Sequence, residues 1–180
     1  MNIDIDHTKH LVLMMTYSCN LHCNYCYERH QSGKNMSVDM ALSIINKEFR
    51  ELTSSPEIKR LEIIFMGGEP LLCWDTICSI VEEVEKKDWP LPYHFFAATN
   101  ATLLDDEKKK WIEKRKDYFI LGISVDGTEQ MQSTNRSEFS AHIDLDYFIR
   151  TWPNPAAPSP YWLEFFGIPF YGDALPLLLA

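Results

Sequence analysis

Three cysteines of this chain are close enough in sequence to act on one metal centre. Cys19, Cys23 and Cys26 have the spacing Cys-x3-Cys-x2-Cys, and the chain has five cysteines in total. Three thiolates can ligate three irons of a cubane iron–sulfur cluster, which leaves the fourth iron open to an external ligand. A zinc ion with His22 or His30 as a fourth ligand is an alternative, and burial of the thiols without a metal is another. The odd count and the tight spacing favour metal binding over disulfides.

Three further short motifs contain glycines or polar residues that could contact a ligand. They are Gly67-Gly68-Glu69-Pro70, Thr99-Asn100 and Ser124-Val125-Asp126-Gly127. Each motif comes at the end of an apolar run that predicts a buried strand. Taken alone, Gly-Gly-Glu-Pro and Asp-Gly also fit ordinary turns.

Strand and helix patterns alternate around these motifs. The predicted strands are 11–15, 61–65, 93–98 and 118–125, and the predicted helices are 38–52, 77–84, 105–116 and 144–151. This alternation, with its long connections, predicts an α/β fold with a parallel sheet and right-handed crossovers. The carboxyl ends of parallel strands form the active-site edge of such folds, so we expect all four motifs on one edge.

The last thirty residues have a different composition. Residues 151–180 contain six of the ten prolines and seven aromatic residues, but only two charged residues, Glu164 and Asp173. Proline at this density argues against a regular helix or a central strand. We therefore expect a core at residues 1–150 and an irregular, divergent tail at residues 151–180.

The overall composition is that of a globular domain and excludes several classes of function. Of the 180 residues, 46% are hydrophobic and 24% are charged. Seventeen basic residues against 26 acidic ones give a net charge of -9, which argues against nucleic acid or an anionic membrane as a partner. The sequence has neither a membrane-spanning apolar run nor the basic and apolar regions of a signal peptide. We expect a cytoplasmic protein.

Together the motifs resemble those of the radical S-adenosylmethionine (SAM) superfamily. The similarity is to its peptide- and protein-modifying branch, which includes the anaerobic sulfatase-maturating enzymes. It extends from about Leu11 to Arg150 and rests on CNLHCNYCYE, MGGEPLL, TNATLL and GISVDG. This resemblance implies a partial parallel (β/α) barrel, of which the chain provides about four of six βα units. It also implies that the three cysteines bind a 4Fe-4S cluster whose open iron binds the amino and carboxylate groups of SAM.

The resemblance assigns further residues to SAM binding. Gly67 and Gly68 would let backbone carbonyls approach the methionyl ammonium, because glycine has no side chain. Arg136 matches a family arginine that pairs with the SAM carboxylate, a task that suits a guanidinium group. The complete implied set is Tyr25, Gly67, Gly68, Glu69, Pro70, Asn100, Ser124, Asp126 and Arg136.

Their individual roles are also implied by the resemblance. Tyr25 matches the family's aromatic residue beside the cofactor. Glu69 would help to hold the ammonium, and Pro70 would fix the turn. Ser124 and Asp126 would face the ribose hydroxyls.

The implied activity is reductive cleavage of SAM to a 5′-deoxyadenosyl radical that acts on a peptide or protein side chain. An external one-electron donor of the flavodoxin or ferredoxin kind would be needed. No cysteine follows Cys78, so the auxiliary clusters of the sulfatase-maturating branch are not expected. We expect a truncated core, which could be inactive. The alternative is a non-catalytic iron–sulfur or zinc binding module or fragment.

Cys73 and Cys78 are predicted to be buried, inert thiols.

Overall fold

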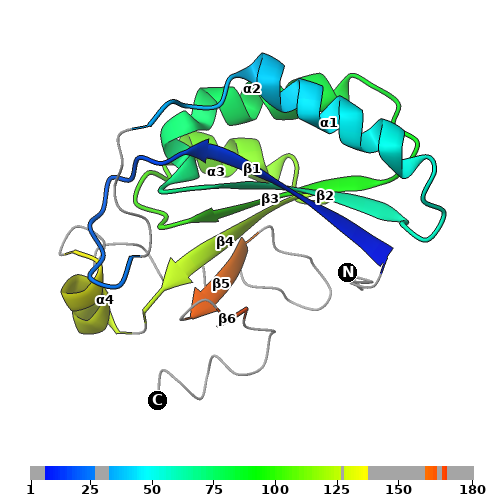
Figure 1. Ribbon diagram of the computed structural model, residues 1–180. Coiled ribbons are helices and arrows are strands. Elements are labelled where there is room, and N and C mark those ends of the chain that lie inside the picture. The colour runs from blue at the N-terminus through cyan, green and yellow to red at the C-terminus, as the bar shows by residue number, and fades with distance from the viewer. Residues whose placement is uncertain (1–6, 27–32, 127, 138–160, 166–167, 170–180) are drawn as a thin grey trace.

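The computed structural model describes residues 7–26, 33–126, 128–137, 161–165 and 168–169 (Figure 1). Its strands and helices follow one another in a regular alternation up to residue 135. In chain order they are β1 (Thr8–Thr16), α1 (Val38–Leu52), β2 (Arg60–Gly67), a 3-10 turn (Pro70–Cys73), α2 (Trp74–Glu85), β3 (Tyr93–Thr99), α3 (Asp106–Glu113), β4 (Phe119–Val125), α4 (Glu129–Asn135), β5 (Tyr161–Phe165) and β6 (Ile168–Pro169).

The strands form one sheet in the order β1-β2-β3-β4-β5-β6. Neighbouring strands from β1 to β5 are parallel, and β6 is antiparallel to β5. Helices α1, α2 and α3 cover one face of the sheet, and α4 lies near the end to which the strands point (Figure 1). The α/β class and the parallel sheet predicted from the sequence are confirmed, with four βα units, of which the fourth contains a helix at a position that was not predicted. In the described part of the chain, no helix combines the length and the apolar character needed to cross a membrane.

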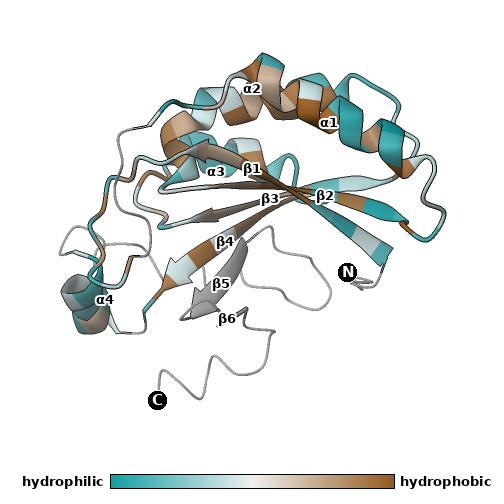
Figure 2. Ribbon diagram, viewed as in Figure 1, coloured by the Kyte–Doolittle hydropathy of each residue, from teal (hydrophilic) through white to brown (hydrophobic). Residues whose placement is uncertain are grey.

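The core lies between the sheet and the three covering helices. Alternate residues of β2, namely Leu61, Ile63 and Phe65, are fully buried, as expected for the covered face of a strand. Figure 2 shows hydrophobic residues concentrated in the strands and hydrophilic ones on the outer side of α1. The buried residues that the two longest helices contribute are Ala41, Ile45, Phe49, Leu52, Ile77, Ile80, Val81 and Val84.

Helix boundaries follow the capping residues in the sequence. Ser37 accepts a hydrogen bond from the backbone N–H of Met40, so α1 begins at Val38 as predicted. Asp105 caps α3 in the same way through the N–H of Lys108. The predicted helix 105–116 ends earlier, at Glu113, and continues as turns.

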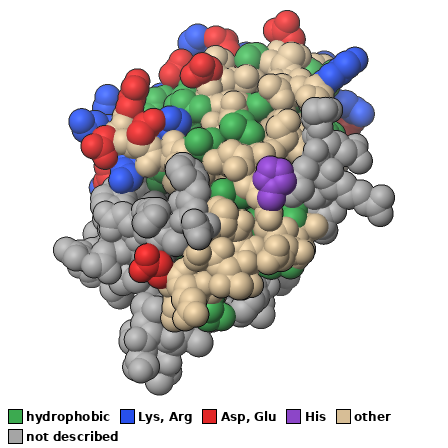
Figure 3. Space-filling model, turned by 90° about the vertical axis from the view of Figure 1, so that its left-hand side faces the viewer, with side chains coloured by type: hydrophobic (Ala, Val, Ile, Leu, Met, Phe, Trp, Pro, Cys, Tyr) green, Lys and Arg blue, Asp and Glu red, His purple; other side chains and the backbone are tan. Residues whose placement is uncertain are grey.

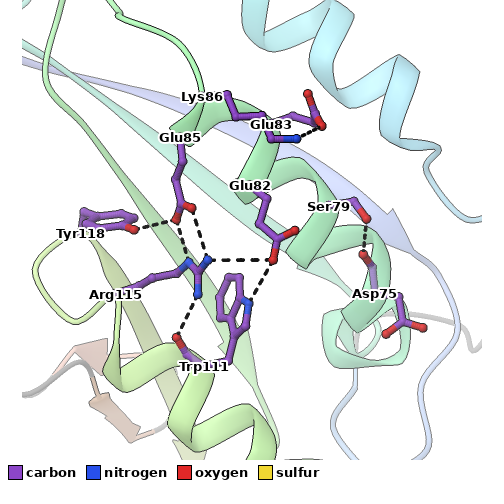
Figure 4. Close-up of polar contacts among 9 residues, drawn as sticks. All are labelled: Asp75, Ser79, Glu82, Glu83, Glu85, Lys86, Trp111, Arg115 and Tyr118. Atoms are coloured by element: carbon purple, nitrogen blue, oxygen red, sulfur yellow. Dashed lines mark hydrogen bonds and ion pairs between the residues drawn. The ribbon is translucent and has the colours of Figure 1, made fainter.

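An ion-pair network joins the end of α2 to the segment after α3 (Figure 4). Arg115 donates from Nε to Glu85 Oε1 at 2.7 Å and from Nη2 to Oε2 at 3.2 Å. Its guanidinium carbon lies 3.8 Å from the centroid of the Trp111 ring. Tyr118 donates its hydroxyl to Glu85 Oε1 at 2.6 Å. The two helices are therefore fixed to each other on the outer side of the sheet.

The tail is more regular than the prediction of an irregular segment. Residues 161–165 form β5, which pairs in parallel with β4, and residues 168–169 form β6. High proline density hid a run without proline at 161–165, and Pro169 lies in an edge strand, where proline is tolerated. The predicted helix 144–151 and the predicted boundary after residue 150 lie outside the described residues.

Candidate functional site

The four motifs lie at the carboxyl ends of β1 to β4, as predicted. Residues 17–26, called the cysteine loop below, follow β1, and Gly68 follows β2. Asn100 follows β3 and Asp126 follows β4. Figure 3 is turned toward this end of the molecule, and the charged side chains gather in its upper part, at the level of the helices. Because β1 to β4 are parallel, their carboxyl ends lie along the same edge of the sheet, and the four motifs lie there too.

Gly67 and Gly68 let the Gly-Gly-Glu-Pro turn pack against the backbone around the start of the cysteine loop. Gly67 has a φ of +153°, and a Cβ atom there would lie 2.3 Å from the carbonyl oxygen of Thr16. A Cβ atom on Gly68 would lie 2.5 Å from the carbonyl oxygen of Ser18. The backbone N–H of Gly68 donates to Thr16 at 3.0 Å, and that of Glu69 donates to Ser18 at 2.9 Å. The glycines are thus required by contacts within the chain itself.

Glu69 connects the ends of β2 and β3. Its side chain is 1% exposed. Oε1 accepts hydrogen bonds from the N–H of Leu71 at 2.9 Å and the hydroxyl of Thr99 at 2.7 Å, and Oε2 accepts one from the N–H of Asn100 at 2.8 Å. Burial raises the pKa of Glu69, and these hydrogen bonds oppose the rise. The carboxyl group holds two motifs together.

Asn100 reaches the first cysteine. Its Nδ2 donates to Asn20 Oδ1 at 3.0 Å and lies 3.8 Å from Cys19 Sγ. Its Oδ1 accepts hydrogen bonds from the backbone N–H and the hydroxyl of Thr102. Ala101 has a φ of +62°, in the left-handed region that favours glycine. Asn20 and Thr102 were not predicted as site residues, because nothing in the sequence indicates a contact across 82 positions.

The Asp126 carboxylate accepts hydrogen bonds from two other predicted site residues. Tyr25 donates its hydroxyl to both carboxylate oxygens, at 2.7 and 2.8 Å, and Arg136 donates from Nε to Oδ1 at 2.9 Å. The Asp126 residue is 1% exposed. Burial, together with the hydrogen bond to Asp126, raises the pKa of Tyr25, so its hydroxyl remains a donor. Ser124 is half-buried, two positions before Asp126.

Helix α4 was not predicted, although it places Arg136. Thr128 caps it by accepting a hydrogen bond from the N–H of Met131. Its buried Gln132 accepts a hydrogen bond from the N–H of Asp126 at 2.8 Å. The capping threonine was the only signal for this helix, since seven residues show little apolar periodicity.

The three clustered cysteines are free and half-buried. Burial is the main cause that raises the pKa of Cys19 and Cys23. The Arg136 cation opposes this rise at Cys23, and the neighbouring thiols add to it. Three thiols are the donor set that a cluster with one open iron needs. Among the described residues, no three His, Cys, Asp or Glu side chains are arranged to hold a single metal ion.

The other two cysteines lie apart from this loop. Cys73 is buried in the 3-10 turn, as predicted, with Sγ 3.7 Å from the carbonyl oxygen of Met15. Cys78 is half-buried on α2, and burial raises its pKa to about 12. Both thiols are therefore poor nucleophiles at neutral pH.

Comparison with known proteins gives matches over most of the chain. The family model described as the radical SAM superfamily matches residues 13–140. An uncharacterized protein of Methanocaldococcus jannaschii is 37% identical over 126 residues, which are 69% of this chain and 41% of that protein. A serine-type anaerobic sulfatase-maturating enzyme of Klebsiella aerogenes is 25% identical over 126 residues, 67% of this chain and 30% of the enzyme.

A solved structure has a similar fold. It is native anSMEcpe with bound AdoMet and Kp18Cys peptide, with a TM-score of 0.66 and 23% identity. The match covers 79% of this chain and 41% of that one. The chain therefore spans less than half of the length of each of these relatives.

Proposed function

Because the chain belongs to the radical SAM superfamily, we propose that it binds a 4Fe-4S cluster through Cys19, Cys23 and Cys26 and reductively cleaves SAM. The observation that carries this proposal is the meeting of all four motifs at one edge of the sheet. When bound, the cluster and SAM supply one-electron cleavage of a carbon–sulfur bond and a radical that removes a hydrogen atom from the substrate. The protein supplies ligands and orientation.

The family match favours a cluster over a zinc ion at the cysteine loop. A zinc ion takes four ligands, and three cysteines supply only three of them. In a cubane cluster each cysteine ligates its own iron, so three cysteines leave the fourth iron open.

The residues around the loop would bind and orient SAM. Arg136 is a permanent cation near Cys23, so it would hold the SAM carboxylate close to the cluster. Asp126 accepts hydrogen bonds from both Arg136 and Tyr25 and so fixes the position of Arg136. Asp126 would face the ribose hydroxyls, and Tyr25 would lie beside SAM. Ser124 would add a hydroxyl on the same side.

The residues after β2 and β3 would position the methionyl ammonium of SAM. Backbone carbonyls at Gly67 and Gly68 would accept its hydrogen bonds. Glu69 would support them, since its carboxyl group already fixes the turn. Pro70 would make that turn rigid, and Asn100 would orient the loop at Cys19.

We further propose that the substrate is a peptide or protein side chain and that a flavodoxin- or ferredoxin-like protein donates the electron. The sulfatase-maturating relative and the peptide in the similar solved structure support this substrate class. The proposal applies to the longer proteins that these relatives represent, because the chain spans only part of their length.

The test is anaerobic reconstitution with iron and sulfide, followed by an assay for 5′-deoxyadenosine in the presence of SAM and a reductant. Cys19→Ala is expected to lower the iron content and abolish the product. Cys78→Ala is the matched control and is expected to retain both, because Cys78 lies on α2. Bound zinc in place of iron, with Cys19→Ala harmless to metal content, would contradict the proposal.

A further inference from the structure

Asn24 lies inside the cysteine loop, directly after Cys23, and contacts the end of α4. Its backbone N–H donates to the carbonyl oxygen of Asn135 at 2.8 Å. Its Nδ2 donates to the carbonyl oxygen of Thr134 at 2.9 Å. The last carbonyl groups of a helix have no donor within the helix and need partners from elsewhere. Asn24 supplies two such donors, and its side chain does so across 110 positions of sequence.

The same helix end determines where Arg136 lies. The backbone N–H of Arg136 donates to the carbonyl oxygen of Gln132 at 2.9 Å, and its Nε donates to Asp126. Tyr25, the neighbour of Asn24, donates to the same carboxylate. Two adjacent residues of the cysteine loop therefore reach Arg136 by separate routes, Asn24 through α4 and Tyr25 through Asp126.

We propose that Asn24 is a positioning residue that fixes the cysteine ligands relative to Arg136. This inference rests on the proposed function, in which the SAM carboxylate meets both the open iron and Arg136. A ligand held at two points binds tightly only when those points are already correctly placed. Asparagine suits the task because its neutral amide donates to carbonyl oxygens, whereas an aspartate would bring a negative charge to the negative end of the helix dipole.

The first test measures the affinity of the reconstituted full chain for SAM. N24A is expected to bind SAM about tenfold more weakly at unchanged iron content, since one hydrogen bond is lost. N46A is the matched control: Asn46 also donates Nδ2 to a helical carbonyl, that of Leu42, but on α1. Because Asn24 acts through Arg136, N24A is expected to cause no further weakening in an R136A background.

The second test needs no cluster. In the cluster-free chain, N24A is expected to speed hydrogen exchange of the Arg136 amide about tenfold, because the end of α4 loses a partner. Amides of β2 serve as the internal reference and are expected to exchange at the same rate as in the unaltered chain.

Three results would overturn the inference. They are an unchanged affinity of N24A for SAM, a weakening of equal size with and without Arg136, and an unchanged exchange rate of the Arg136 amide. If the unaltered chain takes up no cluster, the proposed function fails instead, and the exchange measurement still decides whether Asn24 fixes the end of α4.

Discussion

The Asp126 side chain ties Tyr25 to Arg136, and this places a permanent cation near Cys23. Burial raises the pKa of Cys19 and Cys23, so both thiols are protonated at neutral pH. A thiol must lose its proton to ligate a metal, and loading is therefore favoured by higher pH. At Cys23, Arg136 eases this loss because its positive charge stabilises the thiolate.

We predict that R136A slows alkylation of Cys23 in the cluster-free chain. The thiolate is the reactive form, and loss of the cation raises the pKa of Cys23 further, so the rate at pH 8 falls several-fold. The measurement is the rate of iodoacetamide modification of each cysteine by peptide mass spectrometry between pH 7 and 10. Cys78 is the control and stays slow in both proteins. Equal Cys23 rates with and without Arg136 would contradict this account.

Single residues were predictable where a motif marked them. The clustered cysteines, Glu69 and Asp126 stand in short patterns that identify them. Asn20 and Asn24 do not, because their partners lie 82 and 110 positions away and no periodicity links the two sides. The sequence also did not show why residue 68 is glycine, because the backbone oxygen that leaves no room for a side chain belongs to Ser18, in a different loop.

The turn after β2 packs against the loop after β1, and at Gly68 there is no room for a side chain. We predict that Gly68→Ala lowers the free energy of unfolding by about 1–3 kcal/mol, because its Cβ would overlap with the backbone of Ser18. Cluster content is expected to fall with it. The measurements are urea unfolding and iron per chain.

Gly33→Ala provides the matched comparison. A Cβ there would lie 3.0 Å from the side chain of Tyr17, which can move, so the loss of stability is expected to be smaller. If the two substitutions lowered the free energy of unfolding equally, the close backbone contact at Gly68 would not be the cause of its loss.

The network between α2 and α3 contributes stability away from the site. Glu85→Gln removes the charge that accepts two hydrogen bonds from Arg115, and we predict a loss of about 1–2 kcal/mol. Urea unfolding measures the loss. Iron content is expected to stay unchanged, because α2 and α3 cover the face of the sheet (Figure 1). If Glu85→Gln lowered the iron content as much as Gly68→Ala does, the conclusion that this network stabilises the fold without affecting the site would be wrong.

The long elements followed from local patterns, and the short ones did not. Apolar spacing and the capping residue Ser37 predicted both ends of α1 correctly. Helix α4 has seven residues and little periodicity, so its position depends on the contacts of Gln132 and Asn24. Strand β5 lies in a proline-rich segment, where average composition concealed a short run without proline.

The whole molecule combines a parallel sheet, covered on one face by three helices, with one edge at which four separate loops lie. The order of these loops along the sheet follows from the strand order. Residues 13–140 match the family model, and they include every residue that we assign to the cluster and to SAM. The assembly of a single edge is therefore the property on which the proposed function depends.

The most direct test of that property is the electron paramagnetic resonance spectrum of the anaerobically reconstituted, reduced chain, recorded with and without SAM. We predict a signal of a reduced 4Fe-4S cluster whose g values change when SAM is added, because the open iron gains an external ligand. A cluster signal that SAM leaves unchanged, or no cluster signal from an iron-loaded chain, would contradict the account.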